Sequence, residues 1–266
     1  MTARSDLRPW DGSAYHRLGN PQHAWGRAVL DRLPLRGDET VVDAGCGSGR
    51  LTAELLERLP RGHVVALDGS ASMLEAAREY LVPRFGDRVS FVHADLRTLD
   101  LDRACDAVFS TATFHWIHDH DRLFAALLRA LRPGGLLVAQ CGGGPNLRRI
   151  HARAGALMRS EPFAAHFADF CDPWFFADAE SSARRLEAAG FVDVATSVVE
   201  APTVLGDERE YAEFLEKVVL GANLVRLTEP ELQRRFVRAM TEGGRGDDPP
   251  WSLDYWRLNL QGRRPV

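Results

Sequence analysis

The stretch Val41-Val42-Asp43-Ala44-Gly45-Cys46-Gly47-Ser48-Gly49 decides the fold of this chain. It is a short apolar run that ends in glycines, and Leu51, Leu55 and Leu59 follow it at the four-residue spacing of one helix face. The stretch therefore predicts a strand that passes into a helix through a tight turn. Glycine suits such a turn because it adopts positive φ angles and lets a ligand approach the backbone. The helix start also offers unpaired N–H groups to an anion.

The alternation of strand and helix continues to about residue 142. Four further apolar runs predict strands at residues 63–67, 89–92, 107–110 and 136–140. Between them, Ser70 is a candidate N-cap for one helix, and a leucine-rich helix ends at Pro133-Gly134-Gly135. Apolar runs that are joined by helices predict a parallel, doubly wound α/β sheet that is buried on both faces.

The alternation is lost after residue 145. Residues 146–188 are predicted to be helical, and the six aromatic residues in segment 163–176 are predicted to pack as the core of a cap. Strand character returns at residues 191–199 and 253–260, with helices near residues 211–220 and 230–240 and a mobile loop at 243–250. We predict one domain over residues 1–266. Its core comprises about 24–142, 186–200 and 250–262, and its helical cap comprises about 1–23, 145–185 and 205–245.

Composition excludes several classes of protein. The chain has 266 residues, 45% of them hydrophobic, and a formal net charge of −4 from 33 basic and 37 acidic residues. The basic residues form no stripe, so we predict no nucleic-acid partner. No apolar run is long enough for a membrane span or a leader peptide, so we predict a cytoplasmic protein without a membrane partner. The four cysteines form no CxxC pair, which predicts neither disulfides nor a metal site. The oligomeric state stays open.

Two further acids follow predicted strands. Asp68 ends the second run, where a carboxylate accepts hydrogen bonds from both hydroxyls of a ribose. Asp95 ends the third run, where a carboxylate accepts the amino protons of an adenine. The carboxyl ends of parallel strands meet at one edge of the sheet, where open α/β folds bind ligands. The alternative interpretation is that the glycine turn is purely structural and that each aspartate caps a helix or lies on the surface. The turn matches neither the GxGxxG pattern of dinucleotide-binding proteins nor the GK[ST] ending of a phosphate-binding loop.

With these motifs the sequence resembles the class I S-adenosylmethionine-dependent methyltransferases over roughly residues 10–262. The first motif of the family matches Asp43 to Gly49, and its ribose and adenine acids match Asp68 and Asp95, with Leu96 packing on the adenine ring. The resemblance implies a Rossmann-like, mostly parallel seven-stranded sheet with an antiparallel C-terminal hairpin and a helical cap. It also implies S-adenosyl-L-methionine as cofactor and S-adenosyl-L-homocysteine as product. The residues implied to bind the cofactor are Tyr15, Asp43, Gly45, Cys46, Gly47, Gly49, Asp68, Gly69, Met73, Asp95, Leu96 and Ser110.

Two segments resemble a narrower group, the juvenile hormone acid and trans-aconitate methyltransferases, which esterify small carboxylates. They are residues 15–22 and 109–117, in which Gln22 and Trp116 match the residues that hold the carboxylate. An amide NH₂ and an indole N–H are neutral donors, so they fix a carboxylate without neutralising it. His115 contacts the acceptor, serves as a base for another nucleophile, or is a packed structural residue. The alternative is that neither residue binds the acceptor, with Trp116 packed in the core and Gln22 exposed to solvent.

Methyl transfer from a sulfonium needs alignment more than acid or base catalysis. We therefore predict methylation of the carboxylate of a small, apolar acid. The alternative is a small-molecule methyltransferase that acts on another O, N or C nucleophile, with His115 as base, for example in the tailoring of a natural product. A further hypothesis is a binding protein that keeps the fold and the cofactor turn but catalyses no methyl transfer.

Overall fold

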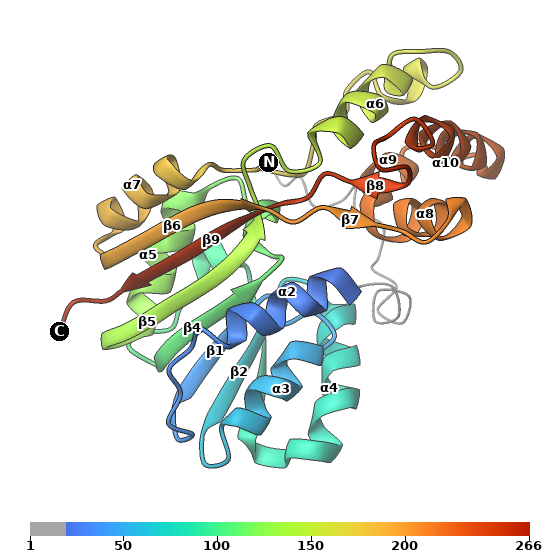
Figure 1. Ribbon diagram of the computed structural model, residues 1–266. Helices are drawn as coiled ribbons and strands as arrows, with labels where there is room; N and C mark the ends of the chain where they lie inside the picture. The colour runs from blue at the N-terminus through green and yellow to red at the C-terminus, as the bar shows by residue number, and fades with distance from the viewer. Residues whose placement is uncertain (1–19) are drawn as a thin grey trace. The chain divides into compact units, whose positions relative to one another are not determined.

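The computed structural model describes residues 20–266 (Figure 1). Contacts within this part of the chain form two compact units. The sheet unit comprises Asn20–Gly144, Trp174–Val199 and Arg257–Val266, and the helical unit comprises Pro145–Pro173 and Glu200–Trp256. The assignment of residues 1–266 to a single domain with a core and a cap stays a prediction.

The sheet unit is built on a seven-stranded sheet with the strand order β3-β2-β1-β4-β5-β9-β6. The strands are β1 Thr40–Ala44, β2 His63–Asp68, β3 Val89–His93, β4 Cys105–Thr111, β5 Leu131–Gly142, β6 Val192–Glu200 and β9 Trp256–Arg263. Neighbouring strands among β1 to β5 pair in parallel, and β9 pairs antiparallel with β5. The predicted Rossmann-like α/β fold is confirmed.

Helices cover both faces of this sheet (Figure 1). They are α2 Asn20–Leu30, α3 Arg50–Arg58 and α4 Ala71–Phe85 on one face, and α5 His120–Ala130 and α7 Ala179–Ala189 on the other. Successive residues of a strand point to opposite faces. Val41 accordingly packs in the cluster that contains Leu55 of α3, and Val42 packs in the cluster that contains Leu127 of α5. Burial on both faces explains why the parallel strands are continuous apolar runs.

The parallel register brings the carboxyl ends of β1, β2, β4 and β5 to one edge of the sheet. Ala44 pairs with Leu67, and Thr111 pairs with Gln140. Three short 3₁₀ helices lie in this unit, namely η1 Gly86–Arg88, η2 Leu96–Thr98 and η3 Phe114–Trp116. The helix η3 follows β4 directly, so it presents its side chains at the same edge as the glycine turn after β1.

The helical unit contains short helices and a two-stranded antiparallel ribbon. Its elements are α6 Arg148–Met158, η4 Ala164–His166, β7 Thr203–Val204, α8 Glu208–Phe214, the π-helix η5 Leu215–Val219, α9 Gly221–Leu224, α10 Pro230–Gly244 and β8 Ser252–Leu253. In residues 20–266, no helix combines the length and the apolar composition that a membrane span requires.

Three expectations for the C-terminal half are corrected. Residues 159–178 contain no helix except η4, because Pro162 and Pro173 oppose helical conformation at and before them. The strand predicted at 253–260 is divided into β8 and β9, and between them Asp254 accepts hydrogen bonds from the start of α6. The loop predicted from residue 243 begins after α10 ends at Gly244. The side chain of Asp247 in this loop is 5% exposed and pairs with Arg149 and Arg153 at 3.2 and 2.7 Å.

Candidate active site

The glycine turn after β1 is fastened to β2 by the backbone. The N–H groups of Gly45 and Cys46 both donate to the carbonyl of Leu67, at 2.7 and 2.9 Å. The N–H group of Gly47 donates to Oδ2 of Asp68 at 2.9 Å. The structure therefore brings the turn and the predicted ribose carboxylate together.

The three glycines of the turn have different environments, although all have positive φ angles. A Cβ on Gly45 would overlap the side chain of Thr113, 2.7 Å from its Cβ atom. A Cβ on Gly49 would lie 2.8 Å from Cδ1 of Leu81, in the contact between α3 and α4. A Cβ on Gly47 would meet no atom of residues 20–266 within 4 Å, apart from its chain neighbours. Gly47 is thus the position at which the turn leaves room for a ligand to approach the backbone.

The carboxylates at the ends of β1 and β2 have contrasting surroundings. Asp43 is 2% exposed, and its Oδ2 accepts a hydrogen bond from the Thr52 hydroxyl at 2.7 Å. Burial raises the pKa of Asp43 to about 7 against the opposing effect of Thr52, and the charge of Asp68 contributes to the increase. The Asp68 carboxylate accepts backbone N–H groups with both oxygens, from Gly47 and, at 2.8 Å, from Ser70.

Asp95 follows β3 and accepts the backbone N–H of Arg97 at 3.0 Å, which caps η2. Its two oxygens also pair with the Arg97 guanidinium, with the shortest distance at 2.6 Å. Arg97 thus orients the carboxylate predicted to bind adenine. Periodicity in the sequence does not indicate this partner, because an i, i+2 pair outside a helix follows no periodic pattern.

The remaining residues predicted to bind the cofactor are divided between the core and the edge of the sheet. Met73 and Leu96 are 6% and 5% exposed, and Cys46 is also buried. Ser110 is buried, and its hydroxyl donates to the Ala44 carbonyl at 2.6 Å, which fastens β4 to β1. Gly69 is half-buried, between Asp68 and the N-cap Ser70. Tyr15 lies outside the described residues. Direct contact of these residues with the cofactor stays a prediction.

An aromatic cluster contains two of the three residues predicted to bind the acceptor. It consists of His115 and Trp116 on η3 together with Trp174 and Phe176. The ring centroids of Trp116 and Trp174 are 5.4 Å apart, and those of His115 and Phe176 are 5.9 Å apart. The aromatic segment 163–176 is therefore divided between the units. Phe163 and Phe167 pack on Phe236 in the helical unit, whereas Trp174 and Phe176 contact η3 in the sheet unit.

The structure holds His115 as a neutral ring. The backbone N–H of Gly142 donates to its Nδ1 at 3.3 Å, so the ring proton resides on Nε2. Burial lowers the pKa of His115 to about 3, and the positive charge of Arg257 adds to this effect. At neutral pH the ring is a hydrogen-bond donor and only a weak base.

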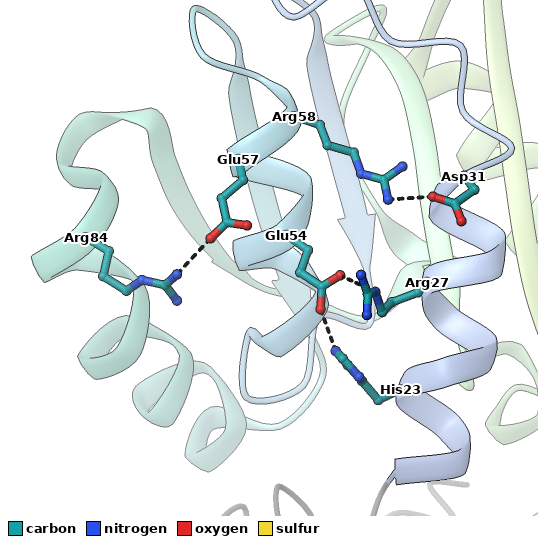
Figure 2. Close-up of polar contacts among 7 residues, drawn as sticks. All are labelled: His23, Arg27, Asp31, Glu54, Glu57, Arg58 and Arg84. Carbon is teal, nitrogen blue, oxygen red and sulfur yellow. Dashed lines mark hydrogen bonds and ion pairs between the residues drawn. The ribbon is translucent and has the colours of Figure 1, made fainter.

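Gln22 is half-buried on α2, and ion pairs fasten this helix to its neighbour (Figure 2). Glu54 of α3 pairs with His23 at 2.6 Å and with Arg27 at 3.0 Å. Arg58 of α3 pairs with Asp31 at the end of α2, at 2.6 Å. Since α3 starts at the glycine turn, these pairs fix the helix that carries Gln22 relative to that turn.

Sequence reasoning missed Arg257, which is 4% exposed on β9. Its guanidinium carbon lies 4.7 Å from the ring centroid of Trp25 on α2, and Arg257 is paired in register with Gly142 at the end of β5. A signal was present, because Arg257 interrupts the apolar run of a strand at the edge where the other candidate residues gather.

Comparisons with known proteins show the family of the chain. Residues 41–135 match the family model described as a methyltransferase domain. The chain is 31% identical over 255 residues to a trans-aconitate 2-methyltransferase of Methylobacterium radiotolerans, covering 92% of this chain and 93% of that one. It is 39% identical over 153 residues to the Azoarcus enzyme of the same name, but that match covers 58% of this chain and 56% of the relative, or about half of each.

A solved structure shows the same fold. Phosphoethanolamine N-methyltransferase 2 of Haemonchus contortus, in complex with phosphomonomethylethanolamine and S-adenosylhomocysteine, matches with a TM-score of 0.64 at 18% identity, over 99% of this chain and 59% of that one. The fold and the site together define an S-adenosylmethionine-dependent methyltransferase. The chain belongs to the class I family of these enzymes, and S-adenosyl-L-methionine is its cofactor.

Proposed function

We propose that this enzyme transfers the methyl group to the carboxylate of a small organic acid and so forms a methyl ester. The state of His115 carries the proposal, because the ring is fixed as a neutral donor and its pKa of about 3 makes it a poor base. A carboxylate is already anionic above about pH 5 and needs no base. The trans-aconitate 2-methyltransferase relative supports an acid acceptor.

The residues around the acceptor suit this chemistry. The side-chain amide of Gln22, the indole N–H of Trp116 and the Nε2–H of His115 are uncharged donors. They orient a carboxylate and leave its negative charge available for attack on the methyl carbon. An ionic clamp on the same carboxylate would reduce its nucleophilicity, because a charge-assisted hydrogen bond stabilises the anion more strongly.

The donor side of the site is assigned to the glycine turn and the aspartates. The residues fit the cofactor because no side chain of residues 20–266 fills the space beside Gly47 and Asp68 lies at the end of β2. Asp68 accepts the ribose hydroxyls, and Asp95, oriented by Arg97, accepts the adenine amino group. When bound, S-adenosyl-L-methionine supplies a methyl group that its sulfonium charge activates.

The decisive experiment identifies the bond that is formed. The enzyme is incubated with S-adenosyl-L-methionine that carries a labelled methyl group and with a panel of acids, phenols and amines, and the products are then treated with alkali. We expect label in acid products only, released by alkali as methanol. Gln22→Ala should lower kcat/KM for acids roughly tenfold, the effect of a lost hydrogen bond, whereas Gln261→Ala on β9 should not. Alkali-stable label would contradict ester formation.

The pH dependence of the reaction tests the role of His115. At saturating cofactor, kcat/KM for an acid should stay constant from about pH 5.5 to 8.5, because the acceptor is ionised and the pKa of His115, about 3, lies below this range. His115→Asn should lower the rate by a constant factor at every pH. A rise near pH 6.5 that disappears in His115→Asn would show a general base and refute the assignment.

Cofactor affinity should depend on pH through Asp43. With a pKa of about 7, Asp43 is largely protonated below neutrality in the free enzyme. A cationic cofactor nearby favours the ionised form, so binding releases a proton and affinity rises with pH until Asp43 is ionised without ligand. We expect the Kd for S-adenosyl-L-methionine, measured by calorimetry, to fall roughly tenfold between pH 5.5 and 7 and then level off. Asp43→Asn should remove the slope, and a flat wild-type profile would contradict the prediction.

A further inference from the structure

We propose that His120 is a positioning residue for methyl transfer, whose ring holds the short helix η3 in the orientation that presents His115 to the acceptor. His120 is the first residue of α5, and it lies in the sheet unit together with η3. The inference rests on the proposed function, because it takes the Nε2–H of His115 as a donor to the acceptor. His120 acts through η3 rather than by contact with either substrate.

The helix η3 is too short to fix its own orientation. The N–H group of Trp116 donates to Thr113 and that of Ile117 donates to Phe114, both at 3.0 Å, and a single 3₁₀ turn has poor hydrogen-bond geometry. Ala112, two residues before η3, has a φ angle of 53°, a left-handed conformation that a residue with a Cβ atom adopts only under strain. Contacts from other elements must therefore hold η3 in place.

The ring of His120 supplies one such contact. Its Nε2 lies 3.1 Å from the carbonyl oxygen of Phe114, the first residue of η3. A carbonyl oxygen only accepts, so Nε2 carries the ring proton and donates it. The ring also contacts Phe124 of α5 and Phe175, at centroid distances of 5.3 and 5.0 Å. Since the apolar face of α5 is buried in the sheet unit, His120 connects η3 to a firmly packed helix.

Two further bonds hold His115, the next residue of η3. The backbone N–H of Phe175 donates to the His115 carbonyl at 2.8 Å, and the N–H of Gly142 donates to Nδ1 of its ring at 3.3 Å. Phe175 also packs on His120, so the bonds to two successive carbonyls of η3 come from residues in contact with each other. Loss of the His120 donor would release the first carbonyl and let the His115 ring turn away from the acceptor.

The other ring nitrogen of His120 shows that a histidine is a costly choice at this position. His120 is 2% exposed, and its Nδ1 has no hydrogen-bond partner within residues 20–266. A buried polar atom without a partner destabilises a protein, and a phenyl ring would avoid this cost. Burial also lowers the pKa of His120, so the ring is neutral at pH 7. The bond from Nε2 to η3 is what an imidazole provides here and an apolar ring would not.

Two amide variants test this role, because they place the same donor at different points. The NH₂ group of His120→Gln reaches nearly the position of Nε2, whereas that of His120→Asn is one methylene shorter and overlaps Nδ1. We expect His120→Asn to lower kcat roughly 10- to 100-fold with little change in KM, because misorientation of reacting groups raises the barrier more than it weakens binding. His120→Gln should restore most of the lost rate.

Thermal unfolding and calorimetry with S-adenosyl-L-homocysteine check that the effect is confined to η3. Both amide variants should keep the wild-type Kd, because the cofactor is assigned to the glycine turn. His63→Asn is the matched control. Its Nε2 lies 2.9 Å from the Ser90 hydroxyl at the start of β2, the end of the strand opposite to the candidate site, and its kcat should equal that of the wild type. If His120→Asn does not fold, His120→Phe replaces it, since it keeps an aromatic ring and lacks the donor.

A spectroscopic measurement tests the position of η3 without any acceptor. Long-range ¹H–¹⁵N NMR spectra of the complex with S-adenosyl-L-homocysteine report the ring nitrogens of His115. We expect these resonances to shift in His120→Asn, or in His120→Phe, and to return towards their wild-type positions in His120→Gln. A role of His120 in general stability alone would not distinguish the two amides.

The outcomes separate the two proposals. If the wild type forms no alkali-labile product from any acid, the proposed function fails, and the NMR comparison still decides the role of His120. If the donor-free variant keeps the wild-type kcat and the His115 resonances, the assignment of His120 is overturned and carboxyl methylation stands. The assignment is equally overturned if His120→Gln loses as much kcat as His120→Asn, or if the loss follows a weaker affinity for S-adenosyl-L-homocysteine.

Discussion

Replacing Asp68 with alanine is expected to weaken the binding of S-adenosyl-L-homocysteine by roughly 100-fold. The ribose would lose two charge-assisted hydrogen bonds, which at the lower end of their range are together worth about 3 kcal/mol. The loss has a structural component as well, because Asp68 accepts the N–H groups of Gly47 and Ser70. Without the carboxylate, these two N–H groups lose their acceptor in the protein and are left to bond with water, so the turn beside the ligand is held less firmly.

Calorimetric titration with S-adenosyl-L-homocysteine measures the effect, and thermal unfolding of the free variants checks the fold. Asp68→Asn keeps one acceptor oxygen and loses the charge, so its affinity should lie between those of the wild type and Asp68→Ala. Asp87→Ala removes an exposed carboxylate from η1 and should leave the Kd within about twofold, since an exposed charge contributes little. Wild-type affinity in a folded Asp68→Ala variant would remove the ribose assignment.

Sequence periodicity predicted the part of the fold that local pattern determines. The runs at residues 63–67 and 89–92 are confirmed as β2 and β3, and Ser70 caps α4 by accepting the N–H group of Met73. These features depend on neighbours a few residues away. The common edge for the glycine turn and Asp68 then followed from parallel strand order, because parallel strands place their carboxyl ends together.

Periodicity failed where distant contacts decide the conformation. The aromatic residues of segment 163–176 look alike in sequence, but Phe163 packs on Phe236 and Trp174 packs on Trp116. Only the tertiary partners distinguish the two groups. The burial of Arg257 was hidden for the same reason, because its neighbours Trp25 and Gly142 lie far from it in the chain.

Gly45→Ala is expected to lower the stability of the fold, whereas Gly47→Ala is expected to lower the affinity for the cofactor, although the two sites are two residues apart in one turn. Both glycines have positive φ angles, so either substitution costs about 1–2 kcal/mol of backbone strain. At Gly45 the new methyl group also overlaps Thr113, which adds about 1–3 kcal/mol of overpacking. Gly45→Ala should therefore unfold at a lower temperature by roughly 5–10 °C in the absence of any ligand.

Gly47→Ala should fold with only the cost of the backbone strain, since its methyl group meets no atom of the described residues within 4 Å beyond its chain neighbours. The same methyl group would occupy the space assigned to the approaching cofactor, so we expect S-adenosyl-L-homocysteine affinity to fall by at least roughly 100-fold, as for the loss of two good contacts. Thermal unfolding with and without ligand separates the cases: Gly47→Ala should lose most of the ligand-induced stabilisation of the wild type, whereas Gly45→Ala loses intrinsic stability. A cofactor that passes over this turn would have to contact a methyl group on residue 47. Full ligand-induced stabilisation of Gly47→Ala would therefore mean that the cofactor does not bind over the turn.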